Sequence, residues 1–434
     1  MIMNSNRNHP TKGGADNTAP IPENMYFDRE GRLRRMPGYR RVRLPRGRVY
    51  SISTVGEHLL VHLDGGLYSL PLGSTDSTPS KIISLAHSES RCFSFGKICF
   101  VTDGEGLWQI DQHLHASLIS RDPHLCGCSC AQIFDGRLFL SGNTDLPGVI
   151  FYSTPITEGN VTFTGENRLT EGTGLVNIVT LLSIGGYLWI FKAEDDGCGG
   201  IICRRAGDGY PVARVLSHTG LCYGAGSING TPLFIGEGGL MTIREPMNEG
   251  KVAIESLSPI APGIEPKDCR ILVWLCRPLI SVCKKIYLLD MTGRRCSFIS
   301  PVCGYKNDRY VYRYAPTAED NLLIHRHTDG IARGEIYSYT GADGKRIFYS
   351  LEGDRRYAVY PTHEKHLGEE VAPTHTICIG DRIYFATEGG VYLFNSITAD
   401  GKAPDADSED YYAHAGHRVI HRAPDNKKKE RKNS

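Results

Sequence analysis

A repeated β-hairpin pattern runs through most of this chain. Each copy begins at a glycine turn, passes through four or five β-forming residues to a polar turn rich in Asp and Gly, and ends in a second short β run. Asp-Gly and Gly-Gly supply the positive φ angles of tight hairpin turns, so each copy predicts a β-hairpin. The clear copies span residues 56–70, 96–110, 135–153, 185–204, 229–244 and 380–394, and two looser copies span 271–290 and 321–339.

The spacing of these hairpins predicts the fold class. The leading glycines at positions 56, 96, 136, 186 and 230 are 40, 40, 50 and 44 residues apart. A period of about 40 to 50 residues is typical of a four-stranded propeller blade. We therefore expect an all-β protein, a β-propeller of seven or eight blades, or of seven blades and a displaced hairpin. The hairpins would form the inner strands of successive blades, with the segments between them supplying the outer strands.

Two other all-β architectures compete with the propeller. A pair of β-sandwiches or one large barrel would also contain many hairpins. Sandwiches usually place turns about every 8 to 12 residues without a second, longer period, so the longer period favours the propeller.

The ends of the chain differ in composition from the repeat. The first twenty residues are polar and lack the apolar stretch of a secretory signal, and no apolar run approaches the roughly 18 to 20 residues of a membrane span. We expect a soluble protein with a flexible N-terminal arm (1–20), an arginine-rich segment (21–48), a β-propeller (49–403) and a disordered charged tail (404–434). The tail contains DADSED and KKKERK and has little to bury.

The polar clusters of the repeat region do not predict a catalytic, cofactor-binding or metal site. CGCSC carries Cys126, Cys128 and Cys130 at alternate positions, which would place the three sulfurs on one side of a strand, whereas structural zinc sites usually use pairs two to four residues apart. We interpret the scattered cysteines as reduced core thiols. The histidines of THEKH (363 and 366) and HRH (325 and 327) lack the helical i, i+4 spacing of zinc proteases.

TDGEGLW (102–108) is faintly similar to the Asp-box of sialidase-type propellers, shifted by one position. An Asp-box stabilises a turn, and a glycosidase would also need a positioned acidic pair or nucleophile. The sequence offers no such pair.

The strongest charge feature is the arginine-rich segment. Nine arginines and one glutamate lie between Arg29 and Arg48, in a chain with a formal net charge of only +1. Charged side chains also protect exposed edge strands from aggregation, and alternation in RLRRM would then point Leu33 inward. Nine arginines exceed that need, and arginine pairs well with carboxylate and phosphate, so we predict an intermolecular contact, with protein rather than with DNA. The candidate interface residues are Arg32, Arg34, Arg35, Tyr39, Arg40, Arg41 and Arg43.

The same segment carries a family resemblance. PENMYFDREGRLRRMPGY (22–39) resembles the opening of the packaged-DNA stabilisation proteins of short-tailed bacteriophages, which are tail hub or nozzle propellers. The matching positions are Pro22, Asn24, Met25, Gly31, Leu33, Arg34, Pro37 and Gly38.

The resemblance implies a non-enzymatic structural protein of the virion. Copies would form a ring around the tail axis, below the portal and adaptor proteins, made in the host cytoplasm and helping to retain packaged DNA. Its partners would be other copies, portal, adaptor and tail proteins, and the packaged DNA end.

Two other functions remain open at this stage. One is a propeller enzyme or binding module acting on glycans, and the other is a cellular scaffold of the WD40 or kelch type. The Gly-His and Trp-Asp pairs of WD40 repeats do not recur across the hairpins.

Overall fold

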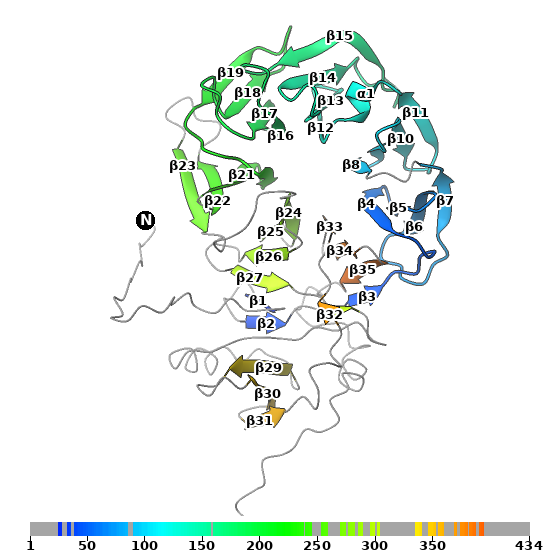
Figure 1. Ribbon diagram of the computed structural model, residues 1–434, viewed down its shortest axis with the longest axis vertical. Helices are drawn as coiled ribbons and strands as arrows, with labels where there is room; N and C mark the ends of the chain where they lie inside the picture. Colours follow the sequence, from blue (N-terminus) through cyan, green and yellow to red (C-terminus); the bar gives the residue numbers. More distant parts are fainter. Residues whose placement is uncertain are drawn as a thin grey trace, which may run out of the picture.

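The computed structural model shows an all-β chain built around a ring of four-stranded sheets (Figure 1). It describes residues 25–27, 33–35, 39–85, 90–157, 159–237, 239–244, 253–258, 270–274, 277–282, 285–289, 296–299, 302–303, 335–340, 346–352, 355–359, 369–370, 374–380, 382–387 and 390–394. Within these ranges the helical structure is a single turn, α1 (Pro123–Cys126).

Seven antiparallel four-stranded sheets form the blades of a β-propeller. Their strands, from the innermost outward, are β4 (Val49–Val55), β5 (His58–Leu63), β6 (Gly66–Pro71) and β7 (Ser80–Ile83) in blade 1; β8 (Arg91–Phe95), β9 (Ile98–Thr102), β10 (Leu107–Asp111) and β11 (Ala116–Ser120) in blade 2; β12 (Cys130–Phe134), β13 (Arg137–Ser141), β14 (Val149–Ser153) and β15 (Phe163–Thr170) in blade 3; β16 (Ile178–Ile184), β17 (Tyr187–Lys192), β18 (Ile201–Arg205) and β19 (Val212–Leu216) in blade 4; β20 (Gly224–Ile228), β21 (Thr231–Gly236), β22 (Gly239–Arg244) and β23 (Ala253–Ser258) in blade 5; β24 (Arg270–Trp274), β25 (Arg277–Val282), β26 (Lys285–Leu289) and β27 (Cys296–Ile299) in blade 6; and β33 (His375–Ile379), β34 (Arg382–Thr387), β35 (Gly390–Phe394) and β3 (Tyr39–Arg41) in blade 7.

The first strand of each blade forms the inner wall of the ring. These strands contact one another in cyclic order, β4, β8, β12, β16, β20, β24, β33 and back to β4. The six clear hairpins therefore lie on six different blades, as the period predicts, and the looser copy at 271–290 lies in blade 6. Their position within the blade was predicted wrongly, because each hairpin forms the second and third strands, and the innermost strand precedes it.

The glycines that define the period occupy the turns between the first and second strands. Asp135-Gly136 and Asn229-Gly230 both have positive φ at the two turn positions, as a type I′ turn requires. This conformation follows the right-handed twist of the flanking strands, which explains why the glycine recurs at this point.

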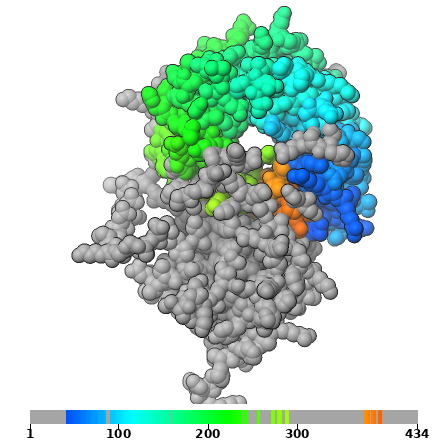
Figure 2. All heavy atoms as spheres, viewed as in Figure 1, coloured from blue at the N-terminus to red at the C-terminus, as the bar shows by residue number. Residues whose placement is uncertain are grey.

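The ring closes with strands from opposite ends of the sequence. In blade 7, β3 pairs antiparallel with β35, placing Tyr39 opposite Phe394 and Arg41 opposite Tyr392. The chain then crosses to blade 1, since the Val42 N–H donates to the Val391 carbonyl of blade 7 at 2.8 Å and the next N–H donates to the Thr75 carbonyl of blade 1 at 2.6 Å. Figure 2 shows the dark blue residues of blade 1 beside the orange residues of blade 7.

Each pair of neighbouring blades encloses an apolar cluster. At the closing seam, buried residues of blade 1 such as Val49 and Leu63 pack against Tyr384, Val391 and Leu393 of blade 7. The core of the propeller is therefore divided into interblade layers.

Several strands lie outside the blades. β1 (Met25–Phe27) pairs with β2 (Leu33–Arg35) and contacts β27 of blade 6, and β28 (Val302–Cys303) pairs with β32 (Glu369–Glu370). A three-stranded sheet contains β29 (Glu335–Thr340), β30 (Arg346–Glu352) and β31 (Arg355–Val359).

This three-stranded sheet lies away from the ring (Figure 1). It includes the described end of the looser copy at 321–339, which is thus displaced from the seven blades. The terminal arms, 1–20 and 404–434, lie outside the described residues. In the described part of the chain, no helix has the length and apolar character to cross a membrane.

Candidate functional site

The arginine-rich segment reaches the propeller at the closing seam. Of the predicted interface residues, Tyr39, Arg40 and Arg41 lie in β3, the outermost strand of blade 7, and Arg43 lies on the crossing to blade 1. The side chains of Arg41 and Arg43 are exposed, whereas Val42 between them is 1% exposed. This alternation follows from the extended chain, which turns successive side chains to opposite faces.

A pocket opens beside this crossing. It has a volume of about 300 Å³ and is lined by Arg41, Val42, Arg43, Leu44, Pro45, Arg46, Gly47, Val49, Leu63 and Gly390. Its apolar side is formed by buried core residues such as Val42, Val49 and Leu63, while three exposed arginines line its opening. We call it the seam pocket. Its lining contains three guanidinium groups and no carboxylate.

The turn that shapes the seam pocket is fixed by Asp64, from the turn between β5 and β6. The Arg48 backbone N–H donates to Asp64 Oδ2 at 3.0 Å. A Cβ atom at Gly47 would approach the same oxygen to 3.2 Å, so glycine suits this close contact. The Arg48 guanidinium lies over the Tyr50 ring, 5.7 Å from its centre, which is within the range of a cation–π contact.

The charge of the seam pocket is not neutralised locally. Among the described residues, no carboxylate lies within ion-pair distance of the Arg43 or Arg46 guanidinium. Arg46 is exposed like Arg43. The pocket therefore presents guanidinium groups that are available to a carboxylate or phosphate from outside the described structure.

The structure does not bring the other predicted interface residues to this pocket. Arg34 and Arg35 lie in β2, which pairs with β1, and Arg32 lies outside the described residues. The predicted inward direction of Leu33 concerns a side chain that is not described. Sequence reasoning did not name Arg46, although the turn-forming Pro45-Arg46-Gly47 was a signal that this arginine would be exposed at a bend.

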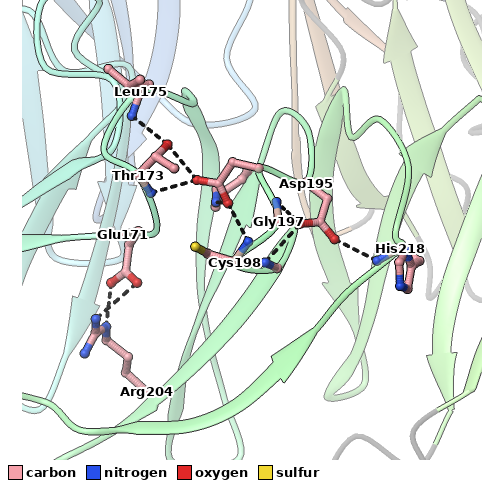
Figure 3. A network of polar contacts seen from close by, with 11 residues as sticks. Glu171, Thr173, Leu175, Asp195, Gly197, Cys198, Arg204 and His218 are labelled. Atoms are coloured by element: carbon pink, nitrogen blue, oxygen red, sulfur yellow. Dashed lines mark hydrogen bonds and ion pairs between the residues drawn. The ribbon is translucent and has the colours of Figure 1, made fainter.

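A buried ion-pair network joins blades 3 and 4 (Figure 3). The ammonium of Lys192, at the end of β17, pairs with Asp196 Oδ1, and their side chains are 0% and 6% exposed. Asp196 also accepts from the backbone N–H of Thr173, the Thr173 hydroxyl and the Cys198 N–H. Burial acts to raise the pKa of Asp196, but Lys192 and these donors outweigh it, so the pKa lies well below its usual value.

The second pair of this network joins Arg204 of β18 to Glu171. Arg204 Nε lies 2.5 Å from Glu171 Oε1, and Nη2 lies 3.1 Å from Oε2. Burial raises the pKa of Glu171, and Arg204 and Lys192 offset this only in part. Both ion pairs thus connect the segment that follows β15 with blade 4, and they hold this connection in place.

A chain of hydrogen bonds between blades 1 and 2 brings a histidine beside serines. His62 Nδ1 lies 2.6 Å from Ser90 Oγ, which lies 2.5 Å from Ser51 Oγ. Ser51 Oγ in turn lies 3.3 Å from Cys92 Sγ. The histidine and both serines are at most 3% exposed, so they stabilise the blade interface and do not offer a nucleophile to a substrate.

CGCSC does not form the predicted strand, so the prediction that its three sulfurs share one side of a strand was wrong. Cys126 ends α1, Cys128 follows it, and only Cys130 lies in β12. The helical turn forms because Asp122 caps it, accepting from the His124 N–H at 2.9 Å, and Pro123 occupies the first turn.

The three cysteines are nevertheless buried free thiols. Burial raises the pKa of Cys126 to about 11 and that of Cys130 to about 12, and it also raises that of Cys128. In the described ranges, no group of three or more His, Cys, Asp or Glu side chains is arranged to hold a metal ion. The histidines of THEKH and HRH lie outside these ranges.

The aspartate of TDGEGLW stabilises a turn. Asp103 is 4% exposed, and its Oδ1 accepts the N–H groups of Glu105 at 3.1 Å and Gly106 at 2.9 Å. This is the turn between β9 and β10, so the group has a structural role.

The comparisons with known proteins give no family. No family model matches the chain, and no curated protein matches it. Solved structures similar to it include virginiamycin B lyase from Staphylococcus aureus (9% identity, TM-score 0.48, covering 82% of this chain and 97% of that one). Others are BamB from Moraxella catarrhalis (10%, 0.41, 82% and 96%) and the computationally designed Ika8 protein (9%, 0.45, 82% and 98%). The propeller assignment comes from the strand pairing and ring contacts described above.

Proposed function

We propose that this chain is a non-enzymatic structural subunit of a bacteriophage virion, located in the head-to-tail or tail-hub assembly. Copies would be arranged in a ring and would help to close the portal channel and retain packaged DNA. The residues that resemble packaged-DNA stabilisation proteins, 22–38, directly precede β3.

One observation carries this proposal: the arginine-rich segment closes the propeller and also presents exposed arginines at its surface. Arg41 belongs to the closing strand, while Arg43, Arg46 and Arg48 follow it on the crossing to blade 1. A rigid ring with a charged external surface suits a subunit that must hold its shape while it contacts neighbours.

A protein partner is favoured over DNA. The chain has a formal net charge of +1, so it lacks the broad positive field that supports binding to nucleic acid. A few arginines around a pocket of about 300 Å³ suit recognition of individual carboxylates.

The proposal is tested in particles produced from the genome that carries this gene. The chain should be found by mass spectrometry in purified particles, and the neighbouring genes should encode portal, adaptor and tail proteins. A variant with Arg41, Arg43 and Arg46 changed to Ser should fold with an unchanged melting temperature but fail to enter particles.

A control variant separates this contact from general loss of charge. Arg121→Ser combined with Arg168→Ser removes two exposed arginines from blades 2 and 3 and should enter particles normally. Absence of the wild-type chain from particles contradicts the proposal. Normal incorporation of the triple variant with loss of DNA from the particles would instead assign these arginines to phosphate.

A further inference from the structure

The seam pocket has features of a peptide-binding site that reach beyond the assembly role. Its arginine guanidiniums lie beside an apolar wall, and the lining contains no carboxylate. Arg41 and Arg43 are separated by one buried residue in extended chain, so their Cα atoms lie about 7 Å apart along the backbone direction. An extended ligand with acidic side chains at every second position would match this spacing.

The chain itself contains such a sequence. DADSED (405–410) places Asp405, Asp407 and Glu409 at alternate positions, followed by Asp410, with no basic residue within it. In an extended segment the three alternating carboxylates fall on one face, about 7 Å from each to the next. Their period and charge complement those of the exposed arginines.

The position of β35 allows this segment to reach the pocket. Gly390, the first residue of β35, lines the pocket, and Phe394 at the other end of the strand lies about 14 Å away along it. Eleven residues separate Phe394 from Asp405, and an extended chain of that length spans up to about 37 Å. The acidic segment can therefore return to the pocket beside the strand from which it continues.

We propose that the seam pocket binds the acidic segment 405–410 of the same chain through ion pairs with Arg41, Arg43 and Arg46. Binding within one chain is favoured because a short tether gives an effective concentration of about a millimolar or more, which suits a contact made of a few exposed ion pairs. The docked segment would cover the guanidiniums that the assembly contact uses, so an acidic partner would have to displace it. The docking itself concerns the isolated chain and holds or fails independently of a virion role.

The experiment measures how fast phenylglyoxal modifies individual arginines in the full chain, followed by peptide mass spectrometry. The test variant neutralises the acidic segment with Asp405→Asn, Asp407→Asn, Glu409→Gln and Asp410→Asn. We expect Arg43 and Arg46 to react at least three-fold faster in this variant than in the wild type at low salt. Exposed Arg121, at the end of blade 2, serves as the internal reference and should react equally in both.

A matched tail variant and two further measurements complete the test. Neutralising Lys427, Lys428 and Lys429 to Gln changes the charge of the same tail outside the acidic segment and should leave the protection intact. The protection should be lost in high salt and should not change when the protein is diluted.

Three results would overturn the proposal. Equal modification rates in the wild type and the acidic-segment variant would show that the pocket is not covered by this segment. Protection that disappears on dilution would assign the bound segment to a second copy of the chain. Protection of the neutral-tail variant by an added DNA duplex, without any effect of the tail, would assign the pocket to phosphate.

Discussion

Lys192 provides the sharpest test of the structure, because its ammonium is enclosed by the fold. Its side chain is 0% exposed and pairs with Asp196, which is 6% exposed, so neither charge is solvated when the pair is broken. Lys192→Met keeps most of the aliphatic stem and removes the charge. Removal of one partner from a buried ion pair costs about 3 to 5 kcal/mol. Asp196 keeps its hydrogen bonds from Thr173 and Cys198, so we expect the low end, about 3 kcal/mol.

Urea unfolding followed by tryptophan fluorescence measures this loss. Trp189 is 1% exposed and lies in the same strand, three residues before Lys192, so its emission reports on blade 4. Lys97→Met, at the exposed turn between β8 and β9, is the matched control and should change the free energy of unfolding by no more than about 0.5 kcal/mol.

A double variant separates the ion pair from packing. Lys192→Met combined with Asp196→Asn removes both charges, and the double variant should be at least about 1 kcal/mol more stable than the sum of the two single effects predicts. If Lys192→Met unfolds at the same urea concentration as the wild type with an unchanged slope, the pair contributes nothing to stability, and the reasoning about this network is wrong.

Three further predictions concern the pH dependence, the glycines and the thiols. Because the pKa of Asp196 is lowered from its ordinary value of 3.8, the stability difference between wild type and Asp196→Asn should be full above about pH 5 and shrink as the pH falls below 4, as seen in urea titrations at several pH values. Gly142→Ala should unfold at lower urea than Gly136→Ala: both residues have positive φ, but a Cβ at Gly142 would lie 2.1 Å from Ser129 Oγ and 2.9 Å from a backbone oxygen, whereas Gly136 has open space. Cys198→Ser should remove one rapidly reacting thiol in a titration with Ellman's reagent, because Cys198 is the exposed cysteine of the described set.

The sequence predicts the turns and the number of blades because the glycine requirement is local. A type I′ turn such as Asn229-Gly230 needs positive φ at both residues, and this need repeats with every blade. The innermost strands leave a weaker pattern. In β20, GAGSI, a Cβ at Gly226 would lie 2.9 Å from the Ile271 side chain of the next blade, so crowding near the axis selects small residues with low β-propensity. The hairpins therefore stood out, and the strands that precede them were missed.

The closing strand illustrates a second limit. β3 pairs with β35 across most of the chain length, and no local pattern indicates which distant strand will be its partner. The arginines of the seam pocket could be predicted as exposed and charged. Their gathering around the pocket depends on this pairing, on the buried Val42 and on the Asp64 contact with Arg48 N–H. For CGCSC the signal was present, because Asp122-Pro123 is typical of a helix start.

The seam pocket couples ligand binding to the closure of the ring. Arg41 belongs to blade 7 through its pairing with Tyr392, whereas the Arg43 backbone is hydrogen-bonded to Thr75 of blade 1. A ligand that pairs with both arginines therefore contacts both sides of the seam, and the complete pocket exists only when β3 is paired. Any ligand that binds the closed form alone stabilises it by RT ln(1 + [L]/Kd), which is about 2.7 kcal/mol at a hundred times Kd. An acidic segment in this pocket, from the chain's own tail or from an assembly partner, would thus strengthen the contact between the first and last blades, where no continuous strand connection holds the ring together.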